Sequence, residues 1–237
     1  MSWRSIISTF WLLCFSPIYS VKPSPNLIGK RNSSQKVGTL EPSPISAIQK
    51  SYDWYLDQCT SRPFVTKSIT AACIASAGDL MSQSLEAHVA KETFALNPVR
   101  LKTFFLCGLL YVGPFIHRYY ELLATFARWL HTKYSATNRQ QILGQLFLDQ
   151  TLGVAIFFPL YFYVYEFFEA IVRQSPPSFA RAHAKCLEQI KGVVLMQYRV
   201  YPLANLINFG YVPEQLRVLY SNTVGVLWNI YLCAVIS

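Results

Sequence analysis

The chain has 237 residues, enough for one domain, and 52% of them are apolar while only 14% are charged. Soluble domains carry roughly 25% charged residues, so this composition favours a membrane protein over a protein with a large soluble core. The net charge is +9, but the basic residues are scattered and no nucleic-acid-binding motif accompanies them. We therefore exclude nucleic acid as a partner and expect anionic lipid and organelle targeting to explain the charge.

Residues 1–50 are predicted to be a targeting leader. An apolar run over Ile6–Phe15, too short to span a bilayer, precedes a serine- and proline-rich segment with five basic residues and one acid, Glu41. A signal-like run followed by a transit-like segment suits a plastid reached through the secretory route. A mitochondrial presequence and a plain disordered leader are the alternatives.

Residues 51–237 are predicted to form an all-α, polytopic membrane bundle of four to five kinked helices. The Phe64–Glu86 segment is weakly apolar, and its small residues recur at helical spacing, which lets helix backbones approach closely in lipid. A short interfacial helix over Ile45–Cys59 precedes it. Four further apolar segments follow: Leu101–Phe126, Ile142–Val172, Val193–Val212 and Leu216–Ile236.

Proline and glycine predict kinks or hinges inside these helices. Proline lacks the amide hydrogen and clashes with the preceding turn, so a helix that contains it bends. The predicted hinge positions are Gly113, Pro114, Pro159 and Pro202.

Ionisable and amide side chains inside the apolar segments predict a polar interior or pore. Such groups are expensive in hydrocarbon and mark a partner or a wet cavity. The alternative is that they form interhelical pairs, for example Arg118 with Asp79 or Asp149, that only fasten the bundle. The candidates are Asp79, Gln83, His117, Arg118, Glu121, Asp149 and Gln150, with Glu166 as a further buried acid.

The sequence predicts no catalytic residue, cofactor or metal site. His117 and Glu121 are four residues apart, but two ligands do not make a metal site. The six cysteines form neither a zinc motif nor a CxxC pair, and no phosphate-binding loop or nucleophile elbow occurs. We therefore expect that the protein is not an enzyme. An intramembrane enzyme ranks third, after the channel-like and structural functions described below.

Several spaced motifs occur together over residues 51–237. They are Trp54-Tyr55-Leu56 with Pro63, Gly78-Asp79 with Gln83, Gly113-Pro114 with His117, Asp149-Gln150 with Pro159, and a final block of Asn208-Phe209, Pro213, Arg217 and Trp228. In this order they resemble the family of Mpv-seventeen and the twenty-two-kilodalton peroxisomal membrane protein. Tyr201-Pro202, where the family usually has Trp-Pro, and Cys233, where Ser is common, depart from the pattern.

The resemblance implies an all-helical protein of an organelle membrane, usually drawn with four spans. From it and from the buried charges we expect channel-like passage of small solutes or metabolites, with the mitochondrial inner membrane favoured over plastid or peroxisome. The alternative is a non-conducting structural or assembly factor. The expected partner is the lipid bilayer; a homo-oligomer is compatible with the sequence, and the solute is not specified by it.

Overall fold

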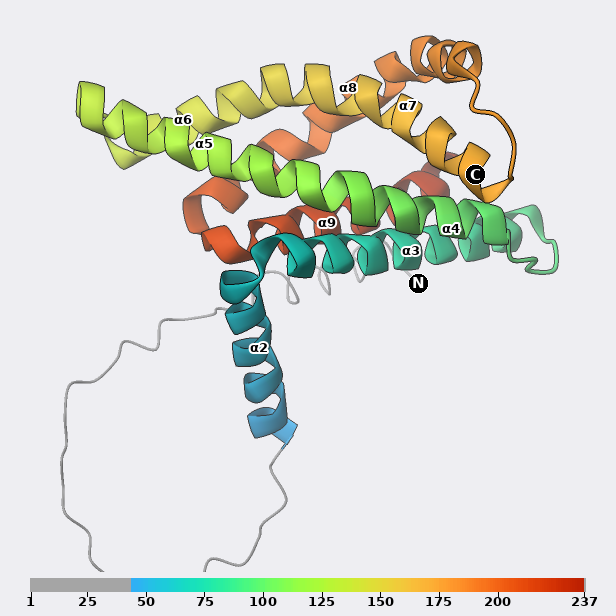
Figure 1. Ribbon diagram of the computed structural model, residues 1–237, viewed down its shortest axis with the longest axis horizontal. Coiled ribbons are helices and arrows are strands. Elements are labelled where there is room, and N and C mark those ends of the chain that lie inside the picture. The colour runs from blue at the N-terminus through green and yellow to red at the C-terminus, as the bar shows by residue number, and fades with distance from the viewer. Residues whose placement is uncertain (1–43, 237) are drawn as a thin grey trace, which may run out of the picture. The chain divides into compact units, whose positions relative to one another are not determined.

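Figure 1 shows the computed structural model, which describes residues 44–236 and the side chains of residues 49–227. Most of the predicted leader and the side chain of Trp228 lie outside these residues. Within the described part every regular element is helical, which confirms the all-α prediction. The elements form six continuous helices: α2 (Pro44–Ser61), α3 (Pro63–Ala90), α4–η1–α5 (Pro98–Tyr134), α6–η2–α7 (Asn138–Val172), α8 (Phe179–Tyr211) and, after the short turn η3 (Glu214–Leu216), α9 (Arg217–Ile236).

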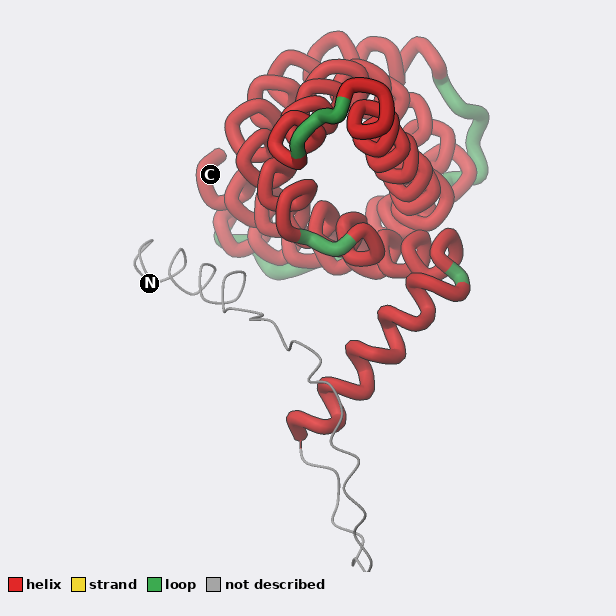
Figure 2. The backbone as a smooth tube through the Cα atoms, turned by 90° about the vertical axis from the view of Figure 1, so that its left-hand side faces the viewer, coloured by secondary structure: helices red, strands yellow, loops and turns green. Residues whose placement is uncertain are grey.

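Five of the six helices pack side by side into a closed ring, seen end-on in Figure 2. α3 packs against α4–η1–α5 on one side and against α9 on the other, and the α6–η2–α7 helix and α8 complete the circle. α2 lies outside the ring, steeply inclined to it in both views, and contacts α3 and η3 (Figures 1 and 2).

Local sequence signals start several of these helices. Pro63 opens α3 in the first turn, where its missing amide hydrogen costs nothing. The Asn97 side chain accepts from the Arg100 backbone N–H at 3.0 Å at the start of α4. Thr137 and Gln140 form a reciprocal capping box at the start of α6.

α3 approaches α4–η1–α5 through glycine. A Cβ atom added at Gly108 would lie 2.6 Å from the Ala72 Cα, and one added at Gly113 would lie 2.5 Å from the Ser68 Cα. Backbone-to-backbone contact of this kind leaves no room for a side chain, so these positions need glycine. The small-residue face that the sequence predicts on α3 is thus used inside the ring.

Two π-helical turns interrupt the long helices. The first, η1 (Gly108–Val112), ends just before Pro114, and the Gly113 N–H bonds the Gly108 carbonyl in place of the usual α-helical partner. The second, η2 (Asp149–Gly153), contains the candidate Asp149. α7 and α8, by contrast, run through Pro159 and Pro202 without a break.

Several boundaries differ from the sequence prediction. The helix predicted over 101–126 begins at Pro98 and ends at Tyr134, and the helix predicted from Ile142 begins at Asn138. α3 continues to Ala90 rather than Glu86. α8 joins the polar segment that begins at Phe179 to the apolar segment that ends near Val212, because no proline separates them before Pro202.

The helices Pro98–Tyr134 and Asn138–Val172 are long and apolar enough to cross a membrane, each with a mean hydropathy of 1.5 over its most apolar 18 residues. Only 28% and 17% of those residues are buried inside the protein. A core helix of a soluble protein would be mostly buried, so both helices present apolar faces that suit lipid.

Adding a methyl group at Gly108 or Gly113 is expected to destabilise the protein. Gly108→Ala and Gly113→Ala each force α3 away from its neighbour, at a cost of about 1–3 kcal/mol. Gly192→Ala is the matched control, since its Cβ would meet nothing within 4 Å and alanine favours the helix. Thermal unfolding in detergent, followed by circular dichroism, should rank Gly192→Ala above both. Equal midpoints for all three variants would contradict the close approach.

Candidate functional site

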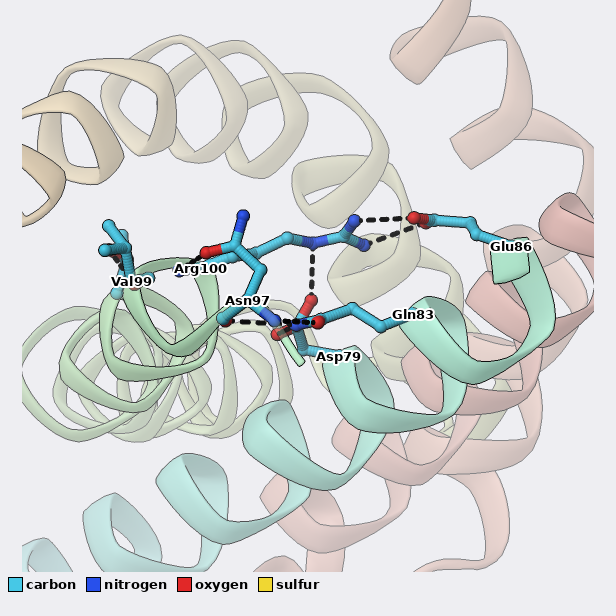
Figure 3. Close-up of polar contacts among 7 residues, drawn as sticks. Asp79, Gln83, Glu86, Asn97, Val99 and Arg100 are labelled. Atoms are coloured by element: carbon cyan, nitrogen blue, oxygen red, sulfur yellow. Dashed lines mark hydrogen bonds and ion pairs between the residues drawn. The ribbon is translucent and has the colours of Figure 1, made fainter. Parts of the chain in front are cut away.

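The first polar cluster joins the end of α3 to the start of α4 (Figure 3). The Arg100 Nε lies 2.6 Å from an oxygen of the buried Asp79, and its two terminal nitrogens bond the Glu86 carboxylate at 2.8 and 3.0 Å. Gln83 donates to Asp79 at 2.7 Å and accepts from the Asn97 backbone at 2.7 Å. Arg100 therefore compensates the buried acid and also anchors the connector between the two helices.

The second cluster lies at the other end of α3. The Lys67 Nζ is 3.3 Å from the His117 Nδ1, and the His117 Nε2 is 3.6 Å from the Glu121 carboxylate. Arg118 bonds Glu121 at 3.0 Å, and the two side chains are 71% and 51% exposed. The Arg118 and Glu121 side chains are therefore not buried, contrary to the sequence prediction.

Arg118 also does not pair with either acid proposed for it. Asp79 forms its ion pair with Arg100, near the start of α4. Asp149 accepts hydrogen bonds from side-chain amide groups. The reason is geometric: the Arg118 side chain is exposed, whereas residue 117 points toward α3.

The third cluster surrounds Asp149 in the η2 turn. Gln150 and the buried Asn205 of α8 both donate to one Asp149 oxygen, at 2.7 and 2.5 Å. The Tyr198 hydroxyl donates to the Gln150 carbonyl at 2.6 Å. Over the part of the chain that the structure describes, no lysine or arginine forms an ion pair with Asp149.

The fourth cluster holds the turn between α8 and α9. Asn208 donates to the Ser221 hydroxyl at 3.1 Å and to the Tyr120 hydroxyl at 3.3 Å, which links α8, α9 and α5. The guanidinium of Arg217 donates to the carbonyls of Phe209 and Val212 at 3.4 Å each, at the end of α8. Three residues of the expected C-terminal motif thus cap a helix and fix a turn.

A further cluster ties the end of α7 to the start of α8. Glu166 is buried, and Arg181 reaches it at 3.2 Å, with Lys185 at 3.9 Å. Of the other motif residues, Trp54 is exposed on α2, and Pro213 precedes η3.

These clusters fall into two layers at opposite ends of the ring. The Phe104 ring contacts Tyr165, which places the Asp79 and Glu166 clusters at one end; we call this the first layer. The Tyr119 hydroxyl bonds the Leu148 carbonyl at 3.2 Å, which places His117 and Asp149 at the other end, with the Asn208 cluster beside them; this is the second layer.

The separation of the layers matches a bilayer. Arg100 and Arg118 are 18 residues apart, about 27 Å at 1.5 Å per residue, and the hydrocarbon core is about 30 Å thick. Between the two layers, aromatic rings fill the contact between α4–η1–α5 and α7. Consecutive rings of Phe115, Phe157, Tyr111 and Tyr161 have centroids 5.3 to 6.1 Å apart. The polar side chains of these helices therefore gather at the two ends rather than along one continuous wall.

The middle of α8 is the exception, and sequence reasoning missed it. It lies beside α7 between the Lys185–Glu166 contact and the Tyr198–Gln150 contact, and so between the two layers. Glu188, Gln189 and Lys191 are exposed there, and space around Gly192 is open. Within the described residues neither Glu188 nor Lys191 forms an ion pair. The missed signal was the lack of proline between Ser178 and Tyr201, which extends the helix through this polar stretch.

Helices of membrane length, lipid-suited outer faces and charge at two levels about one bilayer apart define an all-helical membrane protein. Comparison with known proteins places it more narrowly. Residues 177–233 match the model of the Mpv17 / PMP22 family. The chain is 31% identical to PXMP2/4 family protein 3 of Dictyostelium discoideum over 80% of its length and 92% of the relative, and it belongs to this family.

Other relatives show where members of the family reside. The chain is 28% identical to peroxisomal membrane protein 2 of Bos taurus, covering 82% of this chain and 92% of the relative. It is 25% identical to the mitochondrial inner membrane protein Mpv17 of Drosophila melanogaster, covering 74% and 97%. No solved structure is significantly similar to the chain. The protein is thus a membrane protein of mitochondria or peroxisomes.

Removing one partner of the Asp79–Arg100 pair is expected to cost more than removing both. Arg100→Gln leaves a buried carboxylate uncompensated, and because Arg100 is partly exposed we expect a loss of about 2–3 kcal/mol, below the 3–5 of fully buried pairs. The Asp79→Asn, Arg100→Gln double variant should be more stable than the sum of the single losses predicts.

Glu86→Gln is the control for this cycle. It removes the more exposed carboxylate of the same arginine and should cost no more than about 1 kcal/mol. Unfolding in detergent micelles measures the stability of Asp79→Asn, Arg100→Gln, the double variant and Glu86→Gln. Strictly additive losses for Asp79 and Arg100 would show that the pair is not coupled.

Proposed function

We propose that the protein forms a channel-like passage for small polar solutes across its organelle membrane. One observation carries the proposal: the middle of α8 exposes Glu188, Gln189 and Lys191 between the two polar layers of the ring. A charged side chain facing lipid at the centre of a span costs roughly 2.5–3.5 kcal/mol. An aqueous path beside α8 removes that cost.

The ring architecture supports the same proposal. The five ring helices enclose a common axis (Figure 2), and the two polar layers provide charged groups at both ends of it. Asp149, approached by amide donors, adds negative charge at the second layer.

Charge removal at mid-depth is expected to change ion selectivity in planar bilayers. Glu188→Gln should lower the permeability of cations relative to anions, and Lys191→Gln should raise it, because each removes a charge of one sign from the path. Asp149→Asn should act in the direction of Glu188→Gln. Glu92→Gln, in the exposed connector after α3, is the matched control and should leave the reversal potential unchanged. A purified protein that conducts under no voltage or salt condition rules the channel out.

The second candidate is a non-conducting structural or assembly factor. It is favoured by the pairing of most buried polar groups across helices, as in Asp79 with Arg100 and Glu166 with Arg181, which fastens the bundle without needing a solute. In that case another subunit covers Glu188 and Lys191. A stable complex in mild detergent without conductance would support this candidate. In both cases we propose a non-enzyme.

We propose that four or five of the helices cross the membrane. In the five-span arrangement α3, α8 and α9 cross beside the two long helices. This places the α3–α4 and α7–α8 connectors on one side, and the α5–α6 and α8–α9 connectors on the other.

Cysteine labelling tests this topology. In a cysteine-free background, an impermeant maleimide should label Thr93→Cys and Ser175→Cys from one side of sealed vesicles. It should label Thr132→Cys and Gln215→Cys from the other. Labelling of Gln215→Cys together with Ser175→Cys would show that α8 does not cross.

Residues 1–50 are proposed to direct the protein to the mitochondrial inner membrane. The basic, serine-rich and acid-poor composition of this segment supports the proposal. A fusion of Met1–Lys50 to a fluorescent reporter should colocalise with a mitochondrial marker. Peroxisomal, plastid or secretory-pathway fluorescence would contradict it.

A further inference from the structure

Two buried cations lie at the second layer. Lys67 of α3 and Arg217 of α9 are only 8% and 9% exposed. Within the part of the chain that the structure describes, neither side chain forms an ion pair with a carboxylate. Lysine and arginine are almost never buried to this degree unless an anion compensates their charge. These two cations therefore differ from the buried acids Asp79 and Glu166, which both have basic partners.

Lys67 has hydrogen-bond donors that the protein does not use. A charged ammonium only donates, so the His117 Nδ1, 3.3 Å from the Lys67 Nζ, is the acceptor. The proton of the neutral His117 ring then lies on Nε2, which faces Glu121 at 3.6 Å. A neutral imidazole accepts one N–H and does not balance the charge. The remaining N–H groups of Lys67 have no acceptor among the described residues and are left for a ligand.

Arg217 also keeps part of its guanidinium unused. Its Nε and one terminal nitrogen donate to the carbonyls of Val212 and Phe209 at 3.4 Å each, longer than most hydrogen bonds. These carbonyls, at the end of α8, carry only the partial negative charge of a helix C-terminus. Over residues 49–227 the other terminal nitrogen has no hydrogen-bond partner.

The two cations lie at the same end of neighbouring helices. α2 leads into α3 and contacts η3, which leads into α9, so α3 and α9 start at this end and pack along each other. Gly78 of α3 faces Val226 of α9. Lys67 precedes Gly78 by 11 residues and Arg217 precedes Val226 by nine, so at 1.5 Å per residue their levels differ by about 3 Å.

Glu214 in η3 is the acid that lies near both cations. Its carboxylate is close enough to interact electrostatically with Lys67 and with Arg217, but among the described side chains it forms no ion pair with either. Glu214 is exposed, as are Pro213 and Gln215 on either side of it. Because this turn joins two helices at the end of the bundle, an anion approaches it from water.

We propose that Lys67 and Arg217, with Glu214 beside them, form a binding site for a small soluble oxyanion, either inorganic phosphate or a metabolite with a phosphate or carboxylate group. Ammonium and guanidinium groups are the usual partners of such anions in proteins. The unused N–H groups of both side chains donate to the anion, and its charge compensates both cations. Glu214 competes with the anion for them. The site does not depend on conduction.

Thermal unfolding of the full chain in lipid-free neutral detergent tests the site, with inorganic phosphate compared with chloride at equal ionic strength. Phosphate should raise the unfolding midpoint as its concentration increases, because an anion that binds the folded state stabilises it. Lys67→Met keeps an unbranched side chain and removes the charge, so the apparent phosphate affinity should fall about tenfold, the effect of one hydrogen bond to a charged group. Glu214→Gln should bind phosphate more tightly, since it removes the competing acid.

Lys91→Gln is the matched control, since Lys91 is exposed at the far end of α3. This variant should keep the full response to phosphate. Equal loss in Lys91→Gln and Lys67→Met would show general surface electrostatics and overturn the site. Equal midpoints of the unmutated chain in phosphate and chloride, or an undiminished response in folded Lys67→Met, would also refute the proposal.

The unmutated chain allows a test that does not require Lys67→Met to fold. Phosphate should slow the acetylation of the Lys67 amine by acetic anhydride, measured by mass spectrometry after digestion, and should leave the exposed Lys91 and Lys102 unaffected. Acetylation of Lys67 at the same rate in phosphate and chloride would overturn the site. If an added anionic phospholipid protects Lys67 and inorganic phosphate does not, the ligand is a lipid headgroup and the assignment to a soluble anion is wrong.

Discussion

The cost of a charge in hydrocarbon organises this protein. An ionisable side chain at the centre of a membrane helix must be paired, hydrated or displaced toward the surface. On α3, α5 and α7 the charged side chains are paired or lie toward the surface. They therefore gather in two layers with aromatic rings between them. α8 is the helix on which unpaired charge remains between the two layers, and that difference is why we propose a function for it.

Close backbone contact is the second constraint. In lipid, helices gain little from burying apolar side chains against each other, so shape and van der Waals contact decide their association. Gly108 and Gly113 let α4–η1–α5 contact α3 closely. The π-helical turn η1 begins at Gly108 and directly precedes Gly113 and Pro114. The contact site and the proline therefore fall in one short stretch, where the helix is already irregular.

Much of the fold could be predicted from the sequence. Apolar length gives the long helices, and the small residues of α3 give its close packing. Pairing could not be predicted, because it depends on which helices are neighbours: Asp79 meets Arg100 only when the α3–α4 connector folds back, and Asn205 reaches Asp149 across 56 positions. Arg118 shows the limit of periodicity, since one residue beyond the buried His117 the side chain points outward. Glu188 and Lys191 were missed because the polar stretch that contains them resembles a connector in the sequence. The structure shows that α8 continues through it.

The ring has a consequence for how the protein is made. Its closing contact joins the first ring helix to the last, and Gly78 of α3 faces Val226 of α9 across it. During synthesis α3 emerges long before α9, so the ring stays open until α9 has been made. Throughout that interval the face of α3 that α9 will cover lacks its partner. Assembly is therefore most vulnerable just before α9 emerges, when the other four ring helices are already in place.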